Sequence, residues 1–106
     1  MTTFGGVATS LAAAASLAGC AFIPAHYPRL DEAHAIYAQA AANPQVPCLV
    51  PGQLAEAADA LELADRARDT LDDPAHVDHL AYVASRRALI AQEAAKHAAA
   101  QRWRCP

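Results

Sequence analysis

Three cysteines give this chain its most distinctive chemistry, because a thiol can accept a lipid, pair in a disulfide or ligate a metal. Cys20 ends a segment of unusual composition, since residues 1–19 contain no charged side chain. Cys48 and Cys105 lie in the remainder, which carries all of the charge and a net charge of −3. The spacing therefore separates one cysteine from the other two and predicts different roles for them.

Residues 7–18 form an apolar run that only three hydroxyl side chains interrupt. A helix that crosses a bilayer needs about 20 apolar residues, so this run is too short to span one and instead fits the apolar region of a secretory signal. The run ends in Leu17-Ala18-Gly19-Cys20, which resembles a bacterial lipobox at all four positions. The resemblance implies cleavage before Cys20, thioether lipidation of its thiol and acylation of the new N-terminus. The alternative is a buried alanine-rich helix that happens to contain a cysteine.

The residue after the lipobox bears on the destination of the protein. Ala21 stands there, and by resemblance to the lipoprotein sorting rule a residue other than Asp implies the outer membrane rather than the inner one. Because a triacylated cysteine carries more than one chain, the membrane anchor at Cys20 would be stable. The segment departs from an ordinary signal in lacking an early Lys or Arg. We expect a signal peptide over residues 1–19, a lipidated tether over residues 20–29, and a periplasm-facing domain over residues 30–106.

Alanine accounts for 30 of the 106 residues. It is the best helix former and a poor core filler, so the composition predicts thin, closely packed helices. Apolar spacing predicts helices over residues 31–42, 52–71 and 74–102, with a proline-rich loop at residues 43–51 and Asp31 and Asp73 as N-caps. The short turn near residue 72 makes the last two helices antiparallel. The expected fold class is all-α, a small antiparallel helical hairpin or three-helix bundle.

Each predicted helix has a stripe of apolar residues that is expected to face the core. The expected core stripes are Leu30, Ala33, Tyr37, Ala40 and Ala41; then Leu54, Ala57, Ala58, Leu61, Ala64 and Leu71; then Val77, Leu80, Ala81, Ala84, Ala88, Ala91, Ala95 and Ala98.

The register of the hairpin tests whether the two later cysteines can meet. Counting from the turn places Gly52 beside Ala94. Cys48 then lies about 13 Å further along an extended chain, and the end of the last helix also lies about 13 Å further. Both thiols fall at the open end of the hairpin, so we predict a Cys48–Cys105 disulfide, which an oxidising periplasm would allow. The alternative is two free thiols.

The same register brings opposite charges together across the hairpin. Asp59 and Glu62 are expected near Arg86 and Arg87. Independently solvated charged faces are the alternative, since an exposed ion pair contributes only about 0–1 kcal/mol.

The turn between the last two helices also carries candidate metal ligands. His76 and His79 are three residues apart and share a helix face, with Asp69, Asp72 and Asp73 close by. Imidazole and carboxylate groups could hold zinc or another divalent ion. The alternative is a solvated, polar turn without a metal.

Other chemistry finds little support in the sequence. Ser85 is the one serine after the signal segment, and no base or glycine-rich phosphate loop accompanies it. A small alanine-rich bundle leaves little room for a ligand cavity. We therefore expect neither an enzyme nor a cofactor. The weak negative charge predicts no binding to nucleic acid.

Two segments resemble a known family. Residues 51–57 and 79–95, above all the run His79-Leu80-Ala81-Tyr82, resemble the Ala-rich helical domain of unknown function of proteobacterial envelope lipoproteins. That domain often precedes an OmpA-like peptidoglycan-binding domain. The likeness covers about residues 30–100 and implies an outer-membrane, periplasm-facing module with no known catalytic residues. The 106 residues hold no OmpA-like domain, so we do not expect direct binding to peptidoglycan.

These patterns lead to two functional hypotheses. The first is an outer-membrane lipoprotein, anchored through Cys20, whose helices serve a structural or protein-interaction role with an envelope protein or with a second copy. The alternative is a periplasmic lipoprotein that binds a metal or a small ligand through His76, His79 and the turn aspartates.

Overall fold

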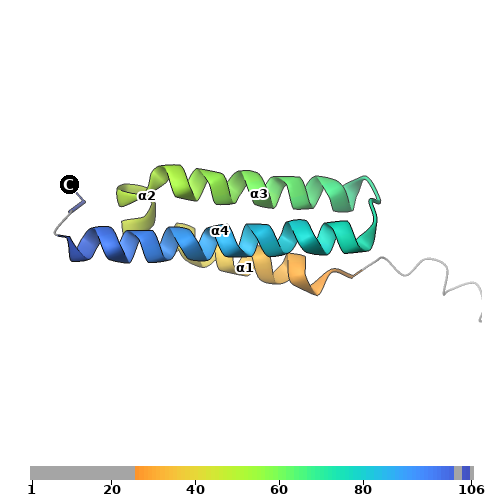
Figure 1. The fold of residues 1–106 in the computed structure, drawn as a ribbon, viewed down its shortest axis with the longest axis horizontal. Coiled ribbons are helices and arrows are strands. Elements are labelled where there is room, and N and C mark those ends of the chain that lie inside the picture. The colour runs from red at the N-terminus through yellow and green to blue at the C-terminus, as the bar shows by residue number, and fades with distance from the viewer. Residues whose placement is uncertain (1–25, 102–103, 106) are drawn as a thin grey trace, which may run out of the picture.

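The computed structural model describes residues 26–101 and 104–105, and within them every regular element is helical. The helices are α1 (Pro28–Ala42), α2 (Gln45–Leu49), α3 (Pro51–Asp69) and α4 (Pro74–Ala100), as Figure 1 shows. The predicted all-α class is therefore confirmed. The three predicted helices are present, and the short α2 is added to them.

Proline marks the start of the three long helices. Pro28, Pro51 and Pro74 each occupy the first turn of a helix, where proline is tolerated because its missing N–H would have no helical partner. Asp73 is the N-cap residue of α4, as predicted, although its side chain makes no capping hydrogen bond.

The first helix begins earlier than predicted. Tyr27 is its N-cap residue, so Pro28 and Arg29 are helical and do not belong to an extended tether. Asp31 is not the cap. It lies in the first turn, where its negative charge interacts favourably with the positive end of the helix dipole.

The predicted loop at residues 43–51 was wrong in part, because Gln45–Leu49 forms α2. Three prolines suggested a loop, but Pro44 is the N-cap of this helix and Pro47 lies in its first turn, so neither removes a helical hydrogen bond. The side-chain oxygen of Asn43 accepts a hydrogen bond from the Gln45 N–H at 3.1 Å. Val46 is fully buried and packs against α4.

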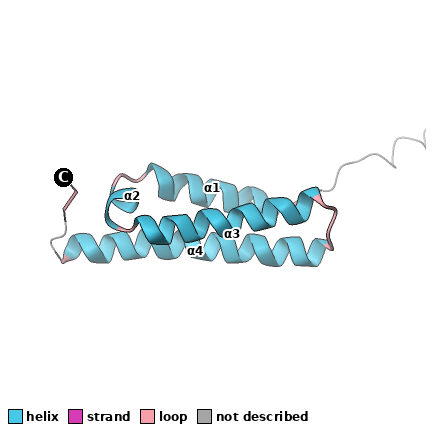
Figure 2. Ribbon diagram, turned by 90° about the horizontal axis from the view of Figure 1, so that it is seen from above, coloured by secondary structure: helices cyan, strands magenta, loops and turns pink. Residues whose placement is uncertain are grey.

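The three long helices lie side by side along one axis (Figures 1 and 2). The chain runs along α1, returns along α3 and runs back along α4, so α1 and α4 are parallel and α3 is antiparallel to both. The hairpin turn and the start of α1 lie at one end, and α2 and Cys105 lie at the other.

The core is a thin seam of alanine. Only Leu30, Val46 and Val77 are large side chains that are fully buried among the described residues. Alanine lets helices approach closely, but each one buries little apolar area. Most of the predicted stripe of α4 is buried: Val77, Ala81, Ala84, Ala88, Ala91 and Ala95. Ala41 is exposed, whereas Ala60 and Ala67, which were not predicted, are buried.

Leu71 was wrongly predicted to belong to the core. Helix α3 ends before it, and Leu71 adopts a left-handed conformation with φ of 58° and is 88% exposed. The Leu71 N–H donates to the Arg68 carbonyl at 3.1 Å, and the Asp72 N–H donates to the Ala67 carbonyl at 3.0 Å. This pair of hydrogen bonds is a Schellman motif, in which glycine usually occupies the left-handed position.

Candidate functional site

The lipobox residues Leu17-Ala18-Gly19-Cys20 lie outside the described part of the chain. The signal segment and Ala21 lie outside it as well. In the described part, none of the helices is both long enough and apolar enough to cross a membrane.

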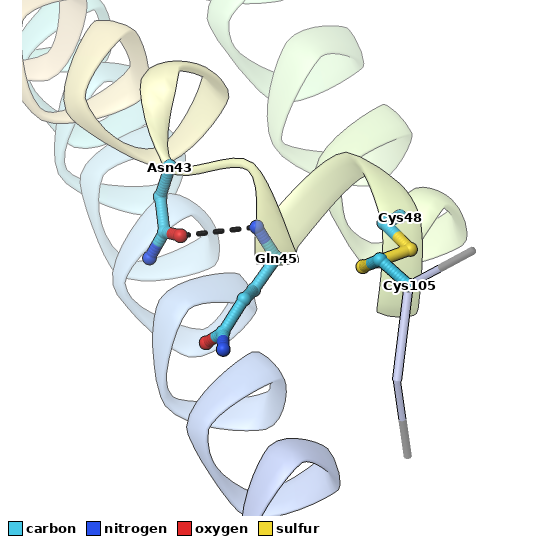
Figure 3. The surroundings of a disulfide bond; sticks show 4 residues. All are labelled: Asn43, Gln45, Cys48 and Cys105. Carbon is cyan, nitrogen blue, oxygen red and sulfur yellow. Dashed lines mark hydrogen bonds between the residues drawn. A yellow bond between two sulfur atoms is a disulfide. The ribbon is translucent and has the colours of Figure 1, made fainter.

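Cys48 and Cys105 are brought together by the fold. They are joined by a disulfide with a Cα–Cα distance of 5.8 Å, and Figure 3 shows the bond between α2 and the segment that follows α4. Cys48 reaches this position on a helix, not along the extended chain that the register estimate assumed. The burial of Val46 against Ala91 and Ala95 holds α2 against α4, and the Asn43–Gln45 hydrogen bond fixes where α2 begins, so together they set the level at which Cys48 lies.

The candidate metal ligands at the α3–α4 turn do not converge. His76 Nε2 lies 3.8 Å from Asp72 Oδ2, and both side chains are about half exposed. His79 is exposed one turn further along α4, and the Asp73 N–H donates to Asp72 Oδ1 at 2.7 Å. Across residues 26–101 and 104–105, no three side chains of the kinds that ligate metals are grouped so that they could hold an ion.

Another histidine makes the more specific contact. The His34 ring on α1 is hydrogen-bonded to Asp65 Oδ1 on α3 at 2.8 Å. Arg68 also approaches Asp65 Oδ1, at 3.7 Å. This polar group joins α1 to the hairpin, and sequence reasoning missed it because the two residues are 31 positions apart.

The predicted charge pairing across the hairpin is present only in part. Arg87 Nη1 lies 3.7 Å from Glu56 Oε2, and Asp59 lines the same surface hollow as Arg87 but is not its ion-pair partner. Glu62 instead pairs with Arg66 within α3. Ser85 is buried, with 7% of its surface exposed, which leaves it poorly placed to act as a nucleophile.

The outer face of α4 carries apolar side chains that sequence reasoning did not assign to any surface. We define this α4 outer face by Tyr82, Arg86, Leu89, Ile90, Glu93 and His97. Tyr82 is 52% exposed, Leu89 41% and Ile90 50%. The last five residues of the face, with Ala94, line an open hollow on the helix surface. Helices α1 and α3 occupy other sides of α4 (Figures 1 and 2), so this face has no partner within the described bundle.

Comparison with known proteins gives one match. No curated protein and no solved structure matches the chain. Residues 28–104 match a protein family, and this range begins with the first residue of α1 and includes all four helices. The chain therefore belongs to the family described as a domain of unknown function, DUF4398.

Proposed function

We propose that this protein is an outer-membrane lipoprotein whose helical bundle faces the periplasm and serves a structural or protein-interaction role in the envelope. The observation that carries the proposal is the distribution of the cysteines. The disulfide accounts for Cys48 and Cys105, and the third cysteine is Cys20 of the lipobox. A structural disulfide is typical of an oxidising compartment, which is where a lipoprotein signal would deliver the bundle.

The surface of the bundle supports an interaction role. The α4 outer face exposes three large apolar side chains, although the core itself is built mainly of alanine. Exposed apolar patches with a polar rim are typical of protein–protein contact sites. The Ala21 position favours the outer membrane by the sorting rule that the lipobox resemblance brings with it.

The anchor is tested by metabolic labelling of the full chain with radioactive palmitate, followed by density-gradient separation of the two membranes. The wild-type chain should incorporate label and sediment with the outer membrane. Cys20→Ala should abolish the label and release the protein from that fraction. Thr9→Ala is the matched control, because it changes a residue of the signal segment outside the lipobox and should keep the label. A wild-type chain without palmitate would refute the anchor.

A further inference from the structure

The α4 outer face is self-complementary when it meets a second copy of itself in the opposite direction. The centre of the face lies between Leu89 and Ile90. Arg86 and Glu93 lie at equal distances on either side of this centre, and so do Tyr82 and His97. Residues 86 and 93 are separated by seven positions, or about 10.5 Å along the helix, so both fall within one helix-to-helix contact.

We propose that the protein forms a twofold-symmetric dimer in which the α4 outer faces of two copies pack antiparallel. In this arrangement Leu89 and Ile90 of one copy pack against the same two residues of the second copy at the centre of the contact. Arg86 faces Glu93 of the second copy, and the twofold axis creates this ion pair twice. Tyr82 faces His97, which places an aromatic ring against an imidazole at each end.

Charge determines the direction of packing. In a parallel pair with the same centre, Arg86 would face Arg86 and Glu93 would face Glu93, and both contacts would be repulsive. In the antiparallel pair every charge on the face meets an opposite one. Such patterns select one arrangement of two helices against another.

Both charged groups are available for this contact in the single chain. Within residues 26–101 and 104–105, no carboxylate forms an ion pair with Arg86, whereas the neighbouring Arg87 is occupied by Glu56. Glu93 approaches Lys96 at 3.9 Å, and both of these side chains are about three-quarters exposed. An exposed pair of this kind is weak and can rearrange at low cost.

The dimer gives the proposed interaction role a specific partner, and it rests on that role but not on the lipid anchor. With three apolar side chains in each copy, the contact belongs among small interfaces.

The proposal is tested by sedimentation equilibrium of the full chain in a density-matched, non-ionic detergent. Arg86→Glu converts both ion pairs of the dimer into repulsive contacts. Because each exposed pair changes an equilibrium constant by up to about fivefold and two pairs are lost, this variant should weaken dimerisation by about 10-fold or more. Glu93→Arg should weaken it equally. The double variant Arg86→Glu/Glu93→Arg restores opposite charges and should dimerise within about threefold of wild type.

Arg29→Glu is the matched control, since it reverses an exposed arginine on α1 and should leave dimerisation unchanged. Helical circular dichroism of each variant shows whether the bundle is intact. At about 100 µM even a weak dimer with a dissociation constant near 10 µM is mostly associated. A wild-type chain that stays monomeric at this concentration overturns the dimer. A double variant that fails to recover while remaining helical also overturns it. Palmitate labelling of the same samples keeps the two proposals apart, because an unlabelled dimer refutes only the anchor and a labelled monomer refutes only the dimer.

Discussion

Loss of the Cys48–Cys105 disulfide should remove a large part of the stability of this bundle. The bond joins residues 57 positions apart, and a loop of this length is worth about 4 kcal/mol in the chain-entropy treatment of the unfolded state. A domain of this size is expected to have a total free energy of unfolding of roughly 4–11 kcal/mol. Only three large side chains are fully buried in the described core, so little apolar burial is present to offset the loss.

The measurement is urea unfolding followed by circular dichroism on residues 21–106 secreted to an oxidising compartment. Three samples are compared: the oxidised protein, the same protein with a reductant, and the variant Cys48→Ser/Cys105→Ser. The free energy of unfolding of the oxidised protein should exceed that of both other samples by about 4 kcal/mol. The reduced protein and the double variant should agree within about 0.5 kcal/mol, because they differ only in the two sulfur atoms.

Two results would refute this reasoning. One is a difference below about 1 kcal/mol between the oxidised protein and the double variant, which would mean that the bond does not constrain the unfolded chain as assumed. The other is the titration of two free thiols in the oxidised protein under denaturing conditions.

Three further substitutions should change the free energy of unfolding, the first raising it and the other two lowering it, each measured by the same urea unfolding against its control. Leu71→Gly should raise the free energy of unfolding by about 0.5–1 kcal/mol because glycine adopts the φ of 58° without strain, whereas Leu71→Ala should not; equal effects would contradict this. Leu30→Ala should lower the free energy of unfolding by about 3 kcal/mol, because it leaves a cavity in the core. Leu63→Ala, at a half-exposed site, should lower it by less than about 1 kcal/mol, so similar losses for the two variants would argue against this core. Ala88→Leu should cost at least about 2 kcal/mol by overpacking the seam, whereas Ala35→Leu at an exposed site should be nearly neutral; a tolerated Ala88→Leu would show that the helices are not closely packed.

The periodicity of α4 was predictable because it is long and its alanines recur at helical spacing. Ala81, Ala84, Ala88, Ala91 and Ala95 all face the other helices as that spacing requires. The short α2 was not predictable in the same way, because five residues are too few to show a period and its prolines resemble those of a loop. The exact ion pair across the hairpin was also missed, since a register counted from the turn depends on where α3 ends. Leu71 was assigned to α3 although that helix stops at Asp69.

The α4 outer face escaped prediction for a different reason. In most bundles the largest apolar side chains mark the buried side, but here the buried side is alanine and the exposed side holds Tyr82, Leu89 and Ile90. A periodicity test treats alanine and leucine alike as apolar, so it finds the seam and does not distinguish the second surface. Side-chain size is the signal that separates the two, because close helix packing admits only small residues.

The disulfide also determines how the protein would bear tension. The chain enters the bundle at the start of α1, and Cys105 lies at the opposite end beside α2 (Figures 1 and 3). The shortest covalent path between these two ends passes along α1 and α2 and then through the sulfur atoms, so α3 and α4 lie outside that path. Reduction would place 57 additional backbone steps under load and lengthen the fully extended chain by about 190 Å. The disulfide therefore limits how far these two ends can be drawn apart while it remains intact.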